Sequence, residues 1–212
     1  MEWGTMGGVS CACCGWTYAV VDVETTGLVP GVDAVVEVAV VLLDEHGEAT
    51  EDWSSLFRPW RQLDATDTHG LSEADLASAS VFATAAGRLD ALLAGRLVVG
   101  HNVGFDAAML AAEWRRLGVE RAWPTADTMD AAAVLGRGRG KLAELLDGVA
   151  VERVGSEHRA ESDAEATAQS WWRLLNEARA RRVHLPVRDT CRHASSGALG
   201  PGPWTPGVKD GP

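Results

Sequence analysis

The sequence predicts a single α/β domain in which a mixed sheet of five strands is flanked by helices. Two observations carry this prediction. Before residue 60, apolar and β-branched segments separated by short turns dominate the chain, which is typical of strands. After residue 70, segments with apolar residues every three or four positions, which is typical of helices, alternate with short apolar runs that are typical of strands. The chain has 212 residues, of which 46% are hydrophobic and 23% charged, as is usual for a globular protein with one core.

Three strands are expected first. Residues 18–23 are rich in valine and lead into a Thr-Thr-Gly turn, and residues 35–43 form an apolar run interrupted by Glu37, as in a buried strand. A turn at residues 44–47 then leads to a third strand over residues 53–58. Short turns between successive strands favour antiparallel pairing, so the sheet should begin as an antiparallel unit.

The remaining elements alternate between helix and strand. The period changes at Ser72, and one helix ending at Gly95 is predicted from four apolar residues on its inner face, Val81, Ala85, Leu89 and Leu92. Two short strands are expected at residues 97–100 and 123–128. Further helices are expected at 106–117 (with Leu110, Trp114 and Leu117 on one stripe), 129–135, 141–146 and 162–181.

The two ends of the chain lack this periodicity. Residues 1–16 contain Gly, Cys and Ser and are interpreted as a flexible leader, residues 17–183 as the folded domain, and residues 184–212 as a disordered tail rich in Pro and Gly. The four cysteines lie in these ends without the paired spacing of a zinc motif, so we interpret them as free thiols.

Charge and hydropathy exclude several classes of protein. No apolar run is long enough to span a bilayer, and the N-terminus lacks the pattern of a secretion signal, so no membrane association and a cytoplasmic location are expected. The net charge of −11 argues against a protein that wraps a long duplex, because Lys and Arg supply most of that affinity. It is compatible with carboxylates that bind divalent cations.

Paired carboxylates mark the first strand. Asp22 and Glu24 are two residues apart, so both side chains project from the same face of a strand. Two adjacent acids repel each other unless a cation lies between them. An isolated pair of this kind is usually explained by an exposed strand end or by pairing with arginine.

Two more acids follow at the starts of predicted helices. Asp106 comes directly after the fourth strand, and Asp163 begins the last helix five residues after His158. Taken singly, each Asp is explained as a helix N-terminal acid that complements the helix dipole, and His158 as a loop histidine.

Together, these segments resemble the three motifs of the DEDDh (DnaQ-like) 3′→5′ exonuclease family, which has the ribonuclease H-like fold. The motifs are D-x-E-T-T-G-L from Asp22, H-N-x-x-F-D ending at Asp106, and H-x4-D from His158 to Asp163. The resemblance covers roughly residues 17–176 and is greatest to the proofreading epsilon subunit of bacterial DNA polymerase III and its stand-alone relatives.

The resemblance implies a set of catalytic roles. Asp22 would bridge two divalent ions, Glu24 and Asp163 would complete one metal site, and Asp106 would act through water or hold the second metal. His158 would be the general base that takes the proton from the attacking water. Oxygen ligands favour Mg²⁺ or Mn²⁺ over zinc, and two such ions are suited to phosphodiester hydrolysis.

The family pattern also implies contacts to the terminal nucleotide. The candidates are Thr25, Leu28, His69, His101 and Phe105. Phe105 is explained equally well as a base-stacking residue and as a core residue. A small basic loop with Arg137, Arg139 and Lys141 is a candidate for phosphate contact, although solvated charge is its default explanation; the same loop lacks the spacing of a P-loop.

We therefore expect a 3′→5′ exonuclease that acts on 3′ ends of DNA, most readily single-stranded ends, and releases nucleoside monophosphates. Two alternatives stay open at this point: an exoribonuclease acting on short or tail RNA, and a catalytically idle module that binds nucleic acid or a polymerase. A polymerase or repair assembly is a candidate partner under the resemblance. All five expected catalytic positions are filled, which argues against the idle module.

Overall fold

The computed structural model describes residues 11–13, 15–61, 70–155 and 158–189. They form a central six-stranded sheet in the order β3-β2-β1-β4-β5-β6. The strands are β1 (Tyr18–Thr25), β2 (Val35–Leu43), β3 (Ala49–Leu56), β4 (Leu97–Gly100), β5 (Pro124–Asp127) and β6 (Arg188–Asp189). The helices are α2 (Glu73–Leu76), α3 (Phe82–Leu93), α4 (Val103–Arg116), α5 (Thr128–Val134), α6 (Leu142–Val149) and α7 (Ala160–Arg181).

The sheet is mixed, as predicted. Strands β1, β2 and β3 pair antiparallel, while β4 runs parallel to both β1 and β5. The predicted α/β architecture is thus confirmed. Among the described residues, no helix combines the length and the apolar character needed to cross a membrane.

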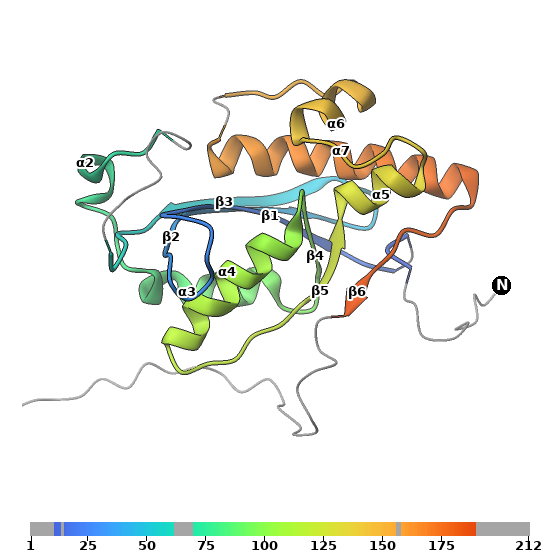
Figure 1. Ribbon diagram of the computed structural model, residues 1–212. Helices are drawn as coiled ribbons and strands as arrows, with labels where there is room; N and C mark the ends of the chain where they lie inside the picture. The colour runs from blue at the N-terminus through green and yellow to red at the C-terminus, as the bar shows by residue number, and fades with distance from the viewer. Residues whose placement is uncertain (1–10, 14, 62–69, 156–157, 190–212) are drawn as a thin grey trace, which may run out of the picture.

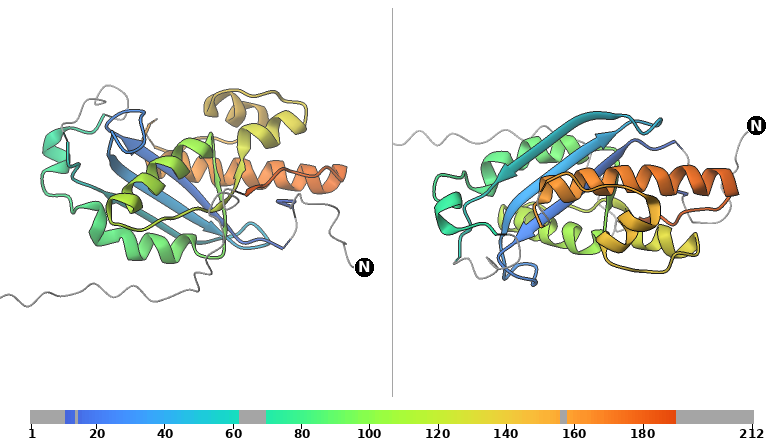
Figure 2. Two further views of the ribbon diagram at one scale, coloured as in Figure 1. Left: turned by 60° about the horizontal axis from the view of Figure 1, so that its bottom comes forward. Right: turned by 90° about the horizontal axis from the view of Figure 1, so that it is seen from above.

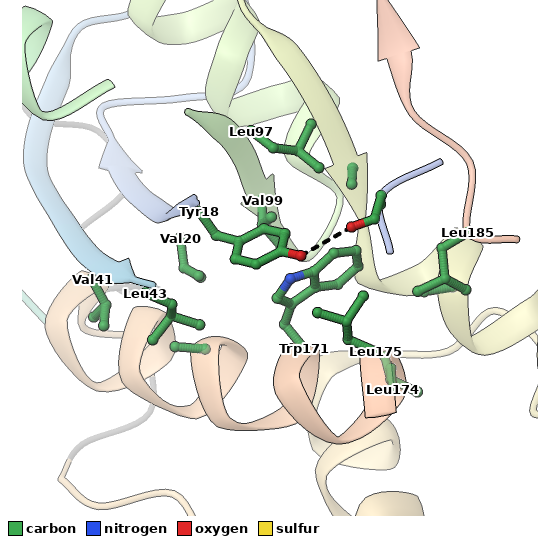
Figure 3. Close-up of a cluster of buried hydrophobic side chains, with 14 of the residues drawn as sticks. Tyr18, Val20, Val41, Leu43, Leu97, Val99, Trp171, Leu174, Leu175 and Leu185 are labelled. Atoms are coloured by element: carbon green, nitrogen blue, oxygen red, sulfur yellow. Dashed lines mark hydrogen bonds between the residues drawn. The ribbon is translucent and has the colours of Figure 1, made fainter. Parts of the chain in front are cut away.

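Helices cover both faces of the sheet (Figure 1), as the turned views also show (Figure 2). On one side, α7 packs over β1 and β2, with Trp171 fully buried against Tyr18 at a ring-centroid separation of 5.8 Å (Figure 3). On the other side lie α3 and α4, whose Leu89 and Leu110 belong to a second core cluster. Every residue of β2 is buried, since both of its faces are covered. Its only charged residue is Glu37.

The predicted domain ends need correction in the described residues. Ala12 and Leu185 were placed in the leader and the tail, yet both are buried, and the Ala12 N–H donates to the Leu185 carbonyl at 3.1 Å. The Tyr18 hydroxyl also donates to the Ala12 carbonyl at 3.0 Å (Figure 3). Strand β6 pairs with the edge of β5 and adds a sixth strand. Strand β6 has only two residues, which is too few to produce a periodic pattern, so the sequence did not predict it.

Two helical predictions were wrong in detail. The region expected to form one helix ending at Gly95 contains two: the short helix α2, capped by the Ser72 side chain, ends at Leu76, and the chain leaves the helical conformation before α3. Helix α3 begins at Phe82, and Val81 is its exposed N-cap residue rather than part of the inner face. Similarly, Leu117 is 41% exposed because it caps the end of α4 instead of continuing its buried stripe.

Candidate active site

The first two acids lie at the carboxyl end of β1, on the face covered by α7. Residues of β1 alternate between the two cores, and Asp22 and Glu24 follow Tyr18 and Val20 on the α7 side. Strand β4 pairs with β1 only as far as Val20, so Asp22 and Glu24 extend beyond the end of β4. The topology therefore leaves both carboxylates at an edge of the sheet beyond the end of β4, next to the turn that leads into α4.

The turn between β4 and α4 brings Asp106 to this edge. Gly100 allows the close approach, since a Cβ there would lie 3.1 Å from the Val21 carbonyl oxygen. Asn102 adopts a left-handed conformation with φ 69°, and its N–H donates to the Asp127 carboxylate at 3.1 Å. Asp106 is 4% exposed in the first turn of α4 and accepts a hydrogen bond from the Val23 N–H at 3.1 Å. Helix α4 begins three residues before the predicted start, so Asp106 is inside the helix.

Helix α7 contributes the remaining acid. Asp163 lies in its first turn, and the oxygens of Asp22, Glu24 and Asp163 all lie within 4.8 Å of one another. The Arg153 Nε lies 3.1 Å from the Asp163 Oδ1, so an arginine balances part of the charge. The structure thus brings Asp163 next to two carboxylates that precede it by 139 residues (Glu24) and 141 residues (Asp22) in the sequence.

Crowding and burial make these carboxyl groups hard to ionise. Burial, followed by repulsion from Asp106 and Asp163, raises the pKa of Asp22 well above its ordinary value. Burial and repulsion from Asp163 raise the pKa of Glu24 to about 8. Burial raises the pKa of Asp106 to about 7, although the Val23 N–H lowers it.

This donor set fits a hard divalent cation. Among the described residues, the ligand atoms that converge are carboxylate oxygens, and the Cys and His side chains that zinc prefers in proteins do not join them. A divalent ion between the oxygens would also relieve the repulsion that contributes to the raised pKa values of Asp22 and Glu24.

His158 lies in the turn that leads into α7. Its backbone has φ 58° and its side chain is exposed. Among the described contacts, no hydrogen bond joins its ring to the three carboxylates. Its role as a general base stays a prediction.

The residue after His158 is anchored in a way that the sequence did not predict. The Arg159 guanidinium donates to both carboxylate oxygens of Glu37, with Nε at 3.1 Å and Nη2 at 2.8 Å. The Ala160 N–H donates to the same carboxylate at 3.1 Å. Glu37 is 2% exposed and stands opposite Glu24 in the pairing of β1 with β2. The visible signal was one glutamate in an otherwise apolar strand.

The predicted nucleotide contacts have different surroundings. Thr25 is buried and donates to the Gly27 carbonyl at 2.6 Å, whereas Leu28 is 79% exposed in the following loop. Phe105 is partly buried and packs against the core cluster of α3 and α4. His69 lies outside the described residues.

His101 is engaged by the protein through both ring nitrogens. Nδ1 lies 2.9 Å from the Thr128 hydroxyl and Nε2 lies 3.0 Å from the Gly140 carbonyl. Burial lowers its pKa. His101 thus links the start of α4 to the basic loop, and its contact with a nucleotide stays a prediction. In that loop, Arg137 pairs with Glu177 and Arg139 with Asp130, so part of its charge is already neutralised.

Comparison with known proteins identifies the family. The model of the RNase_T family, described as exonuclease, matches residues 19–170. The chain belongs to the RNase_T exonuclease family. A DNA polymerase III subunit epsilon-like protein of Rhodobacter capsulatus is 33% identical over 173 residues, and the 3′-5′ exonuclease DinG of Bacillus subtilis is 30% identical over 168 residues.

These relatives are much longer than the matched region. The matches cover 78% and 76% of this chain but only 24% and 18% of the Rhodobacter and Bacillus proteins. The chain therefore spans about a quarter or less of the curated relatives that it matches.

Solved structures of exonucleases share the fold. Exonuclease X in complex with 5′ overhanging duplex DNA superimposes with a TM-score of 0.62 at 24% identity, covering 76% of this chain and 92% of that one. A 3′-exonuclease whose structure shows 3′-end recognition of a histone mRNA stem-loop superimposes with a TM-score of 0.67 at 16% identity, covering 88% of this chain and 74% of that one. The predicted ribonuclease H-like fold is confirmed by these likenesses.

Proposed function

We propose that this chain is a metal-dependent 3′→5′ exonuclease that removes nucleoside monophosphates from the 3′ ends of DNA, with single-stranded ends as its first substrate. The observation that carries the proposal is the cluster of oxygens from Asp22, Glu24 and Asp163 within 4.8 Å of one another. Membership of the exonuclease family supports the reaction type.

The proposed cofactor is a pair of Mg²⁺ or Mn²⁺ ions. Asp22, Glu24 and Asp163 would hold one ion, and Asp22 with Asp106 would hold the second. When bound, such ions lower the pKa of water and stabilise negative charge on the leaving oxygen. The protein's own contribution is to hold the acids together in a cluster that is partly buried, with Asp106 kept in place by the Val23 N–H.

His158 is the proposed general base. It is exposed, so its ring is accessible to a proton from water, and histidine is the side chain that most often serves as a general base. The bidentate contact of Arg159 with Glu37 restrains the backbone next to it. A backbone held in place by Arg159, together with an exposed His158 ring, is suited to a general base that accepts and releases a proton within one turnover.

DNA is favoured over RNA by the names of the relatives, which include DNA polymerase III proteins. One structural neighbour is an exonuclease bound to DNA and another is described with histone mRNA, so the site chemistry is compatible with either sugar. A polymerase or repair assembly is the proposed kind of partner, on the same relatives.

The test is a time course on 5′-labelled single-stranded DNA and RNA of one sequence, with Mg²⁺, Mn²⁺ or EDTA. We expect a ladder that shortens from the 3′ end only with metal, and its loss in Asp22→Ala and Asp163→Ala. Asp147→Ala, which removes an exposed acid of α6, is the matched control and should keep the wild-type rate.

Each other outcome decides an alternative. Faster degradation of RNA would favour an exoribonuclease. No degradation of either substrate would favour a catalytically idle binding module, and undiminished degradation by both alanine variants would refute the assignment of the acids.

A further inference from the structure

A groove of about 330 Å³ lies on the face of the sheet opposite α7. It is formed by the start of β2, the chain after β3, the start of α3 and the end of α4. Trp60, Val81 and Leu117 line it, together with the guanidinium-bearing residues Arg58 and Arg116. Asp22, Glu24 and Asp163 lie on the α7 side, and none of the four proposed metal ligands lines this groove, so it is separate from the candidate active site.

Three of the eight large exposed apolar side chains of the described residues line the groove, and three more lie in the loop that ends at its Ala34. Trp60 is 47% exposed, and Val81 and Leu117 are exposed beside it. Leu28, Val29 and Val32 are exposed in the loop that joins β1 to β2. These six are most of the large exposed apolar side chains in the described chain, where only Val134 and Val154 lie elsewhere. Exposed apolar side chains gathered in this way indicate a binding surface.

Positive charge gathers at the same place. The chain has a net charge of −11, yet Arg58 and Arg116 line the groove. The Arg116 guanidinium lies 3.8 Å from the centroid of the Trp60 ring. The carboxylate of Glu113 in the groove is 6% exposed and accepts from the Val35 N–H at 3.1 Å and from the Trp60 side chain. It also interacts with the charge of Arg116, so Arg58 is the groove arginine whose charge is more available to a ligand. An aromatic ring beside arginines favours an anionic ligand with flat rings.

The groove is continuous with the loop that borders the metal ligands. The Thr26 N–H, one residue after β1, donates to the Ala34 carbonyl at 2.9 Å, and Ala34 lines the groove. Arg61 joins the two sides, since it donates to the Val32 carbonyl at 3.3 Å and pairs with Asp33. A chain of nucleotides that passes over this loop would therefore move from the carboxylates toward Trp60.

We propose that this groove binds the single-stranded nucleic acid upstream of the nucleotide being removed, with one base packed on Trp60 and backbone phosphates near Arg58 and Arg116. The inference rests on the proposed exonuclease function. Stacking on an aromatic ring beside basic residues is how proteins bind single strands without reading their sequence. A subsite of this kind makes long substrates better than short ones, because only long ones reach it.

The test compares a dinucleotide with a 12-nucleotide single strand of DNA. In the wild type, kcat/KM should be higher for the longer substrate. Trp60→Leu and Arg116→Gln should each reduce this preference about tenfold, through KM of the longer substrate rather than kcat. Arg115→Gln is the matched control, because this exposed arginine on the same helix pairs with Glu120 and does not line the groove.

The outcomes separate this inference from the proposed function. An unchanged length preference in both variants, or an equal loss of kcat/KM for both substrates, would overturn the proposed subsite. The groove would then be a candidate surface for binding a protein partner. If the wild type degrades neither substrate, the exonuclease proposal fails. Fluorescence anisotropy of the labelled 12-nucleotide strand then tests whether the groove binds single-stranded DNA. Weaker binding by Trp60→Leu and Arg116→Gln, with Arg115→Gln unchanged, would then support it, and binding that is absent or the same in all four proteins would refute it.

Discussion

The metal-free protein should lose stability as the pH rises from 5 to 8. The carboxyl groups of Glu24 and Asp106 have pKa values raised to about 8 and about 7 in the folded state. A folded state with raised pKa values holds protons that the unfolded chain releases. This contribution to stability is therefore complete below the unfolded pKa values of about 4 and is lost as the pH rises through the folded ones.

The magnitude follows from the two shifts. At about 1.4 kcal/mol for each pKa unit, the part of each shift that lies above pH 5 would remove about 4 kcal/mol for Glu24 and about 3 kcal/mol for Asp106 by pH 8. Solvent screens the partly exposed Glu24, and protonation of one carboxylate relieves its neighbours, so the two losses do not add. We expect a loss of about 3 kcal/mol in the free energy of unfolding, roughly half of the combined value.

Urea unfolding in EDTA, followed by tryptophan fluorescence, measures this loss at pH 5, 6.5 and 8. Mg²⁺ at about one hundred times its dissociation constant should restore about 2.7 kcal/mol at pH 8, because it binds only the folded cluster. Asp22→Asn removes one charge from the cluster and should flatten the pH dependence in EDTA. The lowered pKa of His101 acts in the opposite direction below about pH 6.5, and the variant retains that histidine, so the comparison isolates the carboxylates.

A free energy of unfolding in EDTA that is constant or rises from pH 5 to pH 8 would refute the reasoning. So would an Asp22→Asn variant with the wild-type pH dependence, since the repulsion would then lie elsewhere.

Three further predictions test other contacts. His158→Ala should lower kcat by about 100-fold with little change in KM, as expected for a lost general base, and a steady-state rate near wild type would remove it from the mechanism. Arg159→Met should cost about 3 kcal/mol in urea unfolding because Glu37 stays buried without its cation, and the double variant with Glu37→Met should regain most of this loss; additive losses would contradict the pairing. Gly47→Ala should lower the Tm by about 5 °C, since Gly47 has φ 82° and a Cβ would lie 1.9 Å from the Trp172 ring, and an unchanged melting curve would contradict that contact.

Local patterns in the sequence already determined the chemistry of the candidate site. Asp22 and Glu24 share a strand face because side chains alternate with period two, and this holds in any fold that keeps the strand. Asp106 and Asp163 lie in the first turns of their helices for similarly local reasons. Periodicity was also enough to predict the mixed sheet with helices on both sides, because burial follows the apolar stripe.

Only the tertiary structure decided which distant residues meet. Glu37 and Arg159 are 122 positions apart and pair because of strand register and the path of the chain into α7. The groove at Trp60 and Arg116 and the pairing of Leu185 with Ala12 arise in the same way. Local sequence sets the period of an element, whereas contacts between elements depend on how their surfaces pack, and one side chain in such a contact leaves no period to detect. For this reason the sequence was sufficient to predict the carboxylates and insufficient to predict what holds the adjoining turn in place.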